Sequence, residues 1–150
     1  MKLQDILTPD CTICAAPGSS KKRILEYLSS LAAQQLESHD EFQLLESLMA
    51  REKMGSTGIG NGIAIPHGRV ANITRPIAVV ITTEQMINFD AIDHRKVDIF
   101  IALFVPEDEC QDHLSTLQSI AKIFRDKQFC KQVRKCNNNQ ALFELIQQAS

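Results

Sequence analysis

The chain has 150 residues and a formal net charge of −2, from 16 Lys and Arg against 18 Asp and Glu. A charge so close to zero gives no overall attraction to nucleic acid or to an anionic membrane surface. Hydrophobic residues make up 44% of the chain, enough for the core of one globular domain, but no apolar run reaches the ~20 residues needed to span a bilayer.

The first residues and the cysteines favour a reducing compartment. Acidic residues and a proline lie within the first ten positions, so this segment is not a secretory signal, and we expect a cytoplasmic protein. Five cysteines fit reduced thiols better than a disulfide framework. Cys11 and Cys14 have zinc-knuckle spacing, but Cys130 with Cys136 is a poor second pair, so we expect no metal site.

Two amphipathic helices are predicted in the first third of the chain. After a short apolar lead-in at 3–7, the turn 17–20 precedes a helix that begins at Lys21, because apolar residues recur at helical spacing up to position 36. A second helix is expected to begin at Asp40, with Gln43 as its capping-box partner and a buried stripe over 44–49.

A window of glycines follows the second helix. Five of the six glycines lie between Arg51 and Arg69, in the sequence REKMGSTGIGNGIAIPHGR. Glycine gathers where the backbone approaches another group closely or adopts a positive φ. The loop leads through the apolar run 63–65 into Pro66 and His67. We therefore expect the function here, where one imidazole lies beside exposed backbone N–H groups.

The second half of the chain predicts strands and then helices. The apolar runs 77–83 and 97–105 are typical of central strands covered on both faces, and 90–95 is a loop between them. A helix follows from about Asp112, with Leu114 and Leu117 on its apolar face, and shorter helices are expected at 127–135 and 139–148. This order does not fit a simple βαβ repeat. It predicts a single α/β domain over residues 1–150, with a sheet sandwiched between helical layers.

Three familiar site motifs do not match the sequence. Gly55 and Gly60 have phosphate-loop spacing, but Asn61-Gly62 stands where that motif requires Lys and Ser or Thr. The glycines also alternate without a long preceding strand, which argues against a dinucleotide-binding loop. Ser38, His39 and Asp40 have the residue types of a hydrolase triad, but sequence neighbours cannot converge as one, so Asp40 is interpreted as a helix N-cap.

His67 is the strongest candidate for chemistry. A single histidine is more often a packing residue, but Pro66 fixes the backbone here, and Gly68 is expected to remove bulk beside the ring. A neutral imidazole is a good nucleophile near pH 7. Arg51 near the helix end has a guanidinium suited to a phosphoryl group, and His113 begins a helix, although a solvated Arg51 and a packing His113 are equally compatible with their spacing.

Positive charge is concentrated on the helices that follow His113. A solvated surface is the simpler interpretation, and docking of an anionic partner is the alternative. Aromatic residues make up only 5% of the chain and do not alternate with these charges, which argues against nucleic-acid binding. The cationic residues are Lys122, Arg125, Lys127, Lys131, Arg134 and Lys135.

The segment from Arg51 to Gly68 resembles the active-site signature of the fructose/mannitol-type enzyme IIA domains of the bacterial phosphotransferase system. Its unbroken GSTGIGNGIAIPHG is most similar to the nitrogen-regulatory branch. The resemblance continues through 89–93, 97–98, 103–106 and 113–117, and so covers most of the chain. It implies a mixed sheet between helices.

The resemblance also implies roles for particular residues. His67 matches the histidine that accepts a phosphoryl group from an HPr-like carrier, on the ring nitrogen farther from the backbone. Arg51 matches the arginine that steadies this group, and His113 the second active-site histidine. N–H groups of the loop Gly55, Ser56, Thr57 and Gly58 are expected to stabilise the phosphoryl oxygens. No cofactor or metal is required, because a phosphohistidine donor is already activated.

Three functions remain open from the sequence. The first is a phosphoryl-accepting regulator that acts through the charge added by phosphorylation. The resemblance to the nitrogen-regulatory branch implies that its targets include potassium-transport or sensor-kinase proteins. The second is a sugar-specific IIA component that passes the phosphoryl group to a IIB domain. The third is a binding module in which the loop holds an anionic ligand without covalent chemistry.

Overall fold

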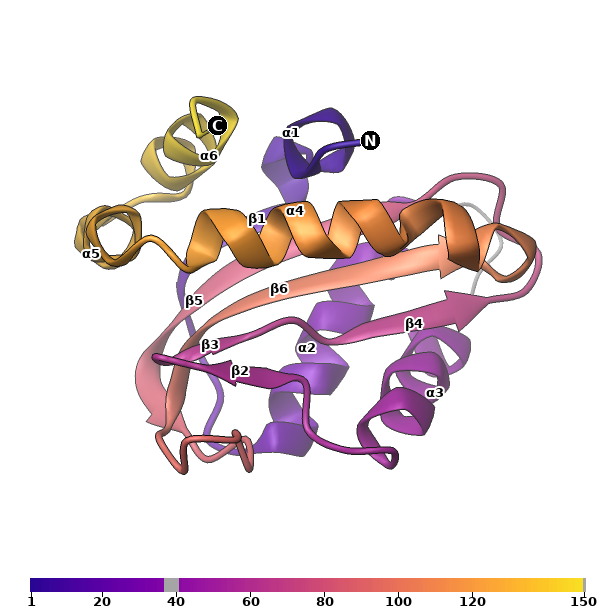
Figure 1. Cartoon of the computed structure of the whole chain (residues 1–150), viewed down its shortest axis with the longest axis horizontal. Coiled ribbons are helices and arrows are strands. Elements are labelled where there is room, and N and C mark those ends of the chain that lie inside the picture. Colours follow the sequence, from indigo (N-terminus) through magenta and orange to yellow (C-terminus); the bar gives the residue numbers. More distant parts are fainter. Residues whose placement is uncertain (37–40, 150) are drawn as a thin grey trace.

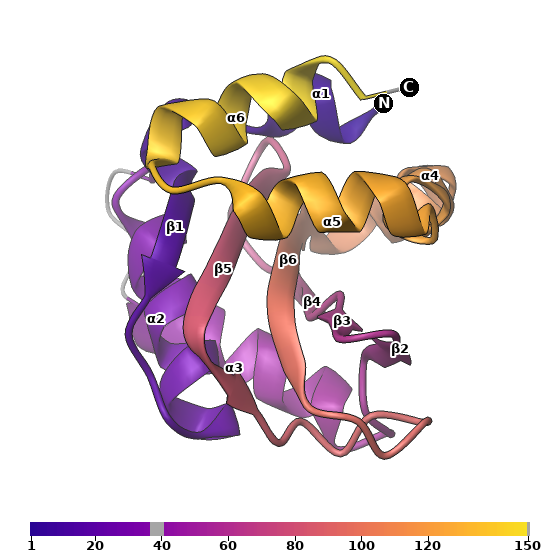
Figure 2. The same ribbon diagram turned by 90° about the vertical axis from the view of Figure 1, so that its left-hand side faces the viewer.

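The computed structural model describes residues 1–36 and 41–149. Two helical layers enclose one mixed sheet, as Figures 1 and 2 show. The helices α2 and α3 cover one face, and α1, α4, α5 and α6 lie on the other. The helices are α1 (Leu3–Ile6), α2 (Lys21–Ala33), α3 (Glu41–Glu52), α4 (Leu114–Phe124), α5 (Lys127–Lys135) and α6 (Asn139–Gln147), with the 3₁₀ turns η1 (Pro9–Cys11) and η2 (Glu107–His113).

The sheet is built around two long strands. Its strands are β1 (Thr12–Ala16), β2 (Gly58–Gly60), β3 (Ile63–Ala64), β4 (His67–Val70), β5 (Ile77–Ile87) and β6 (Val97–Pro106). The order is β1-β5-β6-β3-β2, with β5 and β6 antiparallel and β1 parallel to β5. Both β3 and β4 pair in parallel with β6, one after the other along the same edge. This mixed sheet between helices confirms the predicted α/β fold.

Local sequence explains where several of the helices begin. The Ser20 side chain accepts the N–H of Arg23 at the start of α2, and Asn138 accepts the N–H of Ala141 at the start of α6, as expected of N-cap residues. The predicted cap at Asp40 lies outside the described residues. Asp126, which was not predicted as a cap, accepts the N–H groups of Gln128 and Phe129 and begins α5.

The short strands are the main elements that the sequence prediction missed. Strands β1, β2 and β4 lie in segments for which no strand was predicted, and β5 continues to Ile87 rather than ending at 83. The turn between β2 and β3 is formed by Asn61 and Gly62, with φ of 59° and 83°. Positive φ at both central residues is the requirement of a type I′ hairpin turn.

The start of α4 also differs from its prediction. The helix begins at Leu114 rather than at about Asp112, because η2 extends the connection from β6 as a 3₁₀ turn. Leu114, predicted on the buried face, is 49% exposed. It is the first residue of the helix, so it lies at the rim of the molecule beyond the end of the core.

Four cysteines are described as free thiols, Cys11, Cys14, Cys130 and Cys136. Cys11 and Cys130 are buried, and burial is the first cause that raises the pKa of each thiol. Raised pKa values keep these side chains protonated near neutral pH, so they behave as small core residues.

Candidate active site

A pocket of about 550 Å³ brings the three predicted residues together. Arg51 comes from the last turn of α3, His67 is the first residue of β4, and His113 ends η2. These elements lie at one end of the sheet, with α3 on one side and the connection from β6 to α4 on the other (Figure 1). Segments distant in sequence therefore form one site.

The ring of His67 is fixed by the backbone two residues before it. Its Nδ1 lies 2.9 Å from the carbonyl oxygen of Ile65. A carbonyl only accepts, so this contact requires a proton on Nδ1 and leaves the lone pair of the neutral ring on Nε2. Strand pairing holds the same segment, because the Leu103 N–H donates to the carbonyl of Pro66 at 3.0 Å. The strand thus selects both the tautomer and the direction of the imidazole.

The surroundings of His67 keep the imidazole neutral. The ring is half-buried, and this burial is the first cause that lowers its pKa below the ordinary 6.5. The Arg51 guanidinium lowers the pKa further, whereas the Ile65 carbonyl and Glu52 act in the opposite direction. Because burial outweighs the opposing contacts, His67 carries a free lone pair at neutral pH.

Arg51 is anchored to the glycine loop. Its Nη1 donates a hydrogen bond of 2.8 Å to the carbonyl oxygen of Gly55. A guanidinium has five N–H donors in a planar fork, so this bond leaves others available. Arg51 is therefore a positioned cation in the wall of the pocket that also contains His67.

The loop residues predicted to bind a phosphoryl group are turned to other partners. None of Gly55, Ser56, Thr57 and Gly58 is among the residues that line the pocket. The Thr57 N–H donates to Glu52, and the Gly58 N–H donates to the hydroxyl of Ser56 at 3.0 Å. In this structure the loop acts on the site through the Gly55 carbonyl, which holds Arg51.

A buried carboxylate organises this loop. The side chain of Glu52 is 6% exposed and forms an ion pair of 2.8 Å with Lys21 on α2. It also accepts from the N–H and the hydroxyl of Thr57. The Ser56 hydroxyl donates 2.7 Å to the carbonyl of Phe89, and Lys21 lies over the ring of Phe89. The glycine loop is thus fixed to α2 and to the segment after β5.

His113 is held differently from His67. The residue is 6% exposed, and its Nδ1 is buried without a hydrogen-bond partner among the described residues. It lies between the acidic turn η2 and the first turn of α4. Packing rather than hydrogen bonding holds this ring in the pocket, so its tautomer is not set by a neighbour.

Gly68 has a different role from the one predicted. A Cβ on Gly68 would lie 2.5 Å from the hydroxyl oxygen of Ser47 and 2.8 Å from the backbone carbon of Ser47. The missing side chain thus lets α3 approach β4, and does not clear space beside the imidazole, because successive residues of a strand face opposite sides. The close approach brings the end of α3, and hence Arg51, next to His67.

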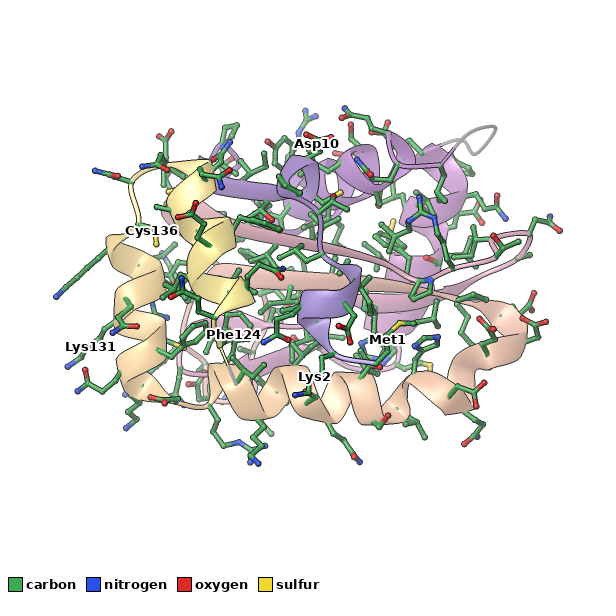
Figure 3. The ribbon with its side chains drawn as sticks, turned by 90° about the horizontal axis from the view of Figure 1, so that it is seen from above. Met1, Lys2, Asp10, Phe124, Lys131 and Cys136 are labelled. Carbon is green, nitrogen blue, oxygen red and sulfur yellow. The ribbon has the colours of Figure 1, made fainter. Side chains whose placement is uncertain are left out.

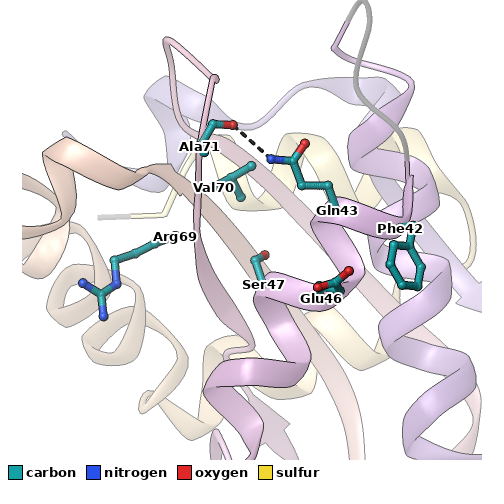
Figure 4. Close-up of a pocket in the computed structure, with 7 residues that line it drawn as sticks. All are labelled: Phe42, Gln43, Glu46, Ser47, Arg69, Val70 and Ala71. Atoms are coloured by element: carbon teal, nitrogen blue, oxygen red, sulfur yellow. Dashed lines mark hydrogen bonds between the residues drawn. The ribbon is translucent and has the colours of Figure 1, made fainter.

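Arg69 and Glu107 line the pocket and were not predicted. Arg69 follows His67 by two residues on β4, so the two side chains share a face of the strand. A second hollow of about 500 Å³ adjoins the first, and Ser47 and Arg69 line both. In Figure 4 the Arg69 side chain points away from Gln43 and Ala71, which are hydrogen-bonded across that hollow. The alternation of a strand, once β4 is recognised, identifies Arg69 as a neighbour of His67.

Over residues 1–36 and 41–149, no group of three or more His, Cys, Asp and Glu side chains could hold a metal ion. None of the helices in the described part of the chain combines the length and the apolar character needed to cross a membrane.

Comparison with known proteins gives close relatives along the whole chain. A nitrogen regulatory protein of Escherichia coli (strain K12) is 44% identical over 147 residues, which cover 97% of this chain and 90% of that protein. The fructose-like EIIA component of a phosphotransferase system from the same organism is 31% identical over 144 residues, covering 96% of this chain and 97% of that protein.

The solved structures agree with these relatives. The nitrogen regulatory protein IIA-Ntr from Neisseria meningitidis superposes with a TM-score of 0.90 at 31% identity, covering 96% of this chain and 98% of that chain. The mannitol IIA of Escherichia coli, at 15% identity and a TM-score of 0.72 over 97% of this chain and 98% of that one, shares the fold. The family described as "Phosphoenolpyruvate-dependent sugar phosphotransferase system, EIIA 2" matches residues 5–149, and the chain belongs to this family.

Proposed function

We propose that this protein accepts a phosphoryl group on Nε2 of His67 from the phosphohistidine of an HPr-like carrier, and that its phosphorylation state regulates partner proteins. The observation that carries the proposal is the hydrogen bond between Nδ1 of His67 and the Ile65 carbonyl. That bond leaves Nε2 as the nucleophilic atom of a ring whose pKa is lowered by burial.

The transfer is balanced without a proton leaving His67. The Nε2 lone pair attacks the phosphorus of the carrier's phosphohistidine, a P–N bond forms on His67, and the donor's P–N bond breaks. The bonding electrons return to the carrier's imidazole nitrogen. The Nδ1 proton stays on the ring, where the Ile65 carbonyl stabilises the positive charge that develops there. The donor bond is already activated, so no metal or cofactor is required.

Arg51 and His113 act on the transferring group. The guanidinium N–H groups that do not contact Gly55 stabilise charge on the phosphoryl oxygens, and the position of Arg51 at the wall of the same pocket supports this role. His113 contributes a second imidazole from the opposite wall. The loop Gly55, Ser56, Thr57 and Gly58 acts through the anchor of Arg51 in the state described here.

The rim of the pocket supports docking of a protein donor rather than a small molecule. Met54 and Leu114 lie at this rim and are 81% and 49% exposed. Exposed apolar side chains around a reactive centre favour a protein partner, because their burial contributes to association. An HPr-like carrier that presents its phosphohistidine within an apolar surface fits this arrangement.

A regulatory output is the more specific part of the proposal. It is supported by relatives named nitrogen regulatory protein that cover almost the whole chain. Phosphorylation adds negative charge at a pocket already bordered by Glu107, so a partner that contacts this rim senses the change electrostatically. Potassium-transport or sensor-kinase proteins are the proposed targets. The protein is proposed to act in the cytoplasm, with residues 1–150 as one EIIA type 2 domain. Neither nucleic-acid binding nor membrane insertion is part of the proposed function.

The direct test compares two histidines. The wild-type protein, His67→Asn and His94→Asn are incubated with a phosphorylated HPr-like carrier, and the intact mass of each is measured. His94 is an exposed loop residue with φ of 62°, a conformation that asparagine tolerates, so its variant is a matched control. Wild type and His94→Asn are expected to gain the mass of one phosphoryl group, and His67→Asn none. A phosphorylated His67→Asn protein would refute the assignment, and an unmodified wild type would favour a non-covalent anion-binding module.

A sugar-transport function is the second candidate. It is favoured by the 31% identical relative named as a fructose-like EIIA component. The phosphorylated protein is mixed with a fructose- or mannitol-type IIB domain, and loss of the phosphoryl group from His67 is followed by mass. Rapid transfer to IIB would support sugar uptake. Retention on His67 would support the regulatory function.

A further inference from the structure

A cationic hollow lies at the end of the molecule opposite the pocket of His67. Its volume is about 230 Å³, and five of the side chains that line it are the cations Arg95, Arg125, Lys127, Lys131 and Arg134. Four belong to the cluster expected from the sequence, and Arg95 joins them from the loop before β6. Lys122 and Lys135 are not among the lining residues.

One of these cations, Arg134, is held by hydrogen bonds at the base of the hollow. The Arg134 guanidinium donates to both carboxylate oxygens of Asp98, at 2.9 to 3.1 Å, and to the carbonyl of Asn61 at 2.8 Å. Gly62 permits this contact, because a Cβ there would lie 2.5 Å from Nη2 of Arg134. The hairpin turn, β6 and α5 are therefore joined at the base of the hollow.

The other four cations form no ion pair within the described part of the molecule. Arg95, Arg125, Lys127 and Lys131 are exposed, and none forms an ion pair with a carboxylate of residues 1–36 or 41–149. The nearby acids have other partners. Asp98 is paired with Arg134, and Asp126 caps α5.

Asp93 accepts backbone N–H groups from Asn61 and Arg95, although it also lies close enough to the Arg95 side chain to interact with its charge. Like charges held together repel, and a negative partner relieves that repulsion. The local excess of positive charge contrasts with the net charge of −2 of the whole chain.

We propose that this surface, formed by the outer side of α5 with Arg95 and Arg125, is a docking site for an acidic polypeptide segment of a partner protein. Lys127, Lys131 and Arg134 recur at positions i, i+4 and i+7, so they lie in a stripe along about 10 Å of one side of the helix. Lys127 and Lys131 supply the unpaired charges there, and Arg134, paired with Asp98, supplies the base beside them. In Figure 3 Lys131 lies at the outer edge of the molecule, whereas Phe124 lies inside. A stripe of this shape fits the side chains of an extended or helical acidic segment.

The shape of the hollow disfavours other anions. Its volume lies below the 300–1,000 Å³ typical of small-molecule pockets, and its cations lie on an open surface. The aromatic residue in its lining, Phe124, is buried and is not available to stack on nucleotide bases. These observations favour aspartate and glutamate side chains of a protein over a nucleotide or a nucleic acid.

The docking site is separate from phosphoryl transfer. Asp98 is five residues before Leu103 along β6, and Leu103 pairs with His67, so the two sites are about 16 Å apart at the rise of a strand. This exceeds the Debye length of about 8 Å at physiological ionic strength. In Figure 1 α4 runs between the two ends, with α5 at one and the acidic turn η2 at the other.

The test uses a peptide of ten glutamates with blocked, uncharged termini. Its binding is measured by NMR chemical shifts and by titration calorimetry, at low and at physiological salt. Binding is expected to shift the amides of α5, Asn61 and Gly62, and to weaken as salt rises. Arg125→Glu/Lys131→Glu should weaken it at least about tenfold, because each change replaces attraction by repulsion. Lys22→Glu/Arg23→Glu, at exposed cations of α2, is the matched control and should bind as wild type.

The outcomes separate this site from the one proposed at His67. His67→Asn should bind the peptide as wild type, whether or not the protein is a phosphoryl acceptor. Equal loss of binding in the two charge-reversal variants would overturn the proposal. It would also be overturned if tripolyphosphate or an oligothymidylate of similar charge shifted the α5 amides and the peptide did not.

Discussion

The two walls of the His67 pocket are built in different ways. The α3–β4 wall, residues 51–69, is fixed by hydrogen bonds at three places: Arg51 to Gly55, Thr57 to Glu52, and His67 to Ile65. The η2–α4 wall, residues 107–114, carries acidic side chains, an exposed leucine and a buried imidazole whose Nδ1 has no partner in the described part of the chain. The first wall fixes directions of side chains, and the second is held by packing.

This difference indicates a division of work within the site. The proposed phosphoryl transfer depends on precise placement of a lone pair and a cation, and hydrogen bonds provide that precision. Docking of a protein partner depends on shape and charge over a larger area, and exposed side chains provide it. Changes to the α3–β4 wall should therefore affect chemistry and stability, and changes to the η2–α4 wall should have smaller effects.

The largest effect is expected at Arg51. Arg51→Met removes the charge and keeps much of the side-chain length, so the rate of His67 phosphorylation should fall by about 10²- to 10³-fold, as when one donor to a developing anion is lost. The rate is measured by quenched-flow mass spectrometry with a phosphorylated HPr-like carrier. His113→Asn, from the other wall, should cost about tenfold. Equal losses in the two variants would contradict the division between the walls.

The next effect concerns two carboxylates, one in each wall. Glu52→Gln removes the carboxylate that pairs with Lys21 at 2.8 Å and leaves it with the exposed Asp90 at 3.8 Å, so it should lower the free energy of unfolding by about 3 kcal/mol. Glu107→Gln, at an exposed residue, should change it by less than about 0.5 kcal/mol. Urea unfolding measures both. Adding Lys21→Met to Glu52→Gln should recover part of the loss, and no recovery would show that the ion pair is not its cause.

A smaller loss of stability is expected at Gly68. Gly68→Ala places a methyl group against Ser47, including its backbone carbon at 2.8 Å, so α3 must move away from β4. Overpacking of this kind costs about 1–3 kcal/mol. Because Arg51 lies at the end of α3, the rate of phosphorylation should fall as well. The change is tested by urea unfolding and by the carrier assay, and a variant with unchanged stability and rate would show that α3 adjusts without strain.

The sequence predicts the parts of the fold in which many residues repeat the same signal. Strands β5 and β6 are long apolar runs, and α2 shows helical spacing over thirteen residues. Strands β2 and β4 have three and four residues, too few for alternation to emerge, and glycine in them carries no burial signal. The Asn61-Gly62 pair was the available sign of a hairpin there.

The candidate site was predictable where its residues share one contiguous segment. Arg51 and His67 lie in the glycine window, and His113 was identified through helix position and family resemblance. The role of Gly68 was not predictable, because it depends on how closely α3 packs on β4. The N–H groups of Thr57 and Gly58 have partners that become visible only in three dimensions, Glu52 and the Ser56 hydroxyl.

The subtlest prediction concerns the protonation of His67. Its pKa in the folded protein is lower than 6.5, first because of burial and then because of Arg51. The phosphorylation rate should therefore keep its plateau at pH 6.5 and decline only below it, as the lone pair is lost to a proton. Arg51→Gln removes the positive charge that contributes to this shift, so NMR titration of the His67 ring should give a higher pKa than in wild type. Arg51→Lys keeps the charge and should leave the pKa of His67 below 6.5.

The same shift affects stability with a defined sign. Between the folded pKa and 6.5, the unfolded chain binds a proton at His67 that the folded protein does not, so the free energy of unfolding rises with pH across this window. His67→Asn should remove that part of the pH dependence, and His94→Asn should retain it. The check is the urea midpoint of each protein as a function of pH from 5 to 7. Parallel profiles for wild type and His67→Asn would show that burial does not keep this imidazole neutral, and that the α3–β4 wall does not prepare the nucleophile.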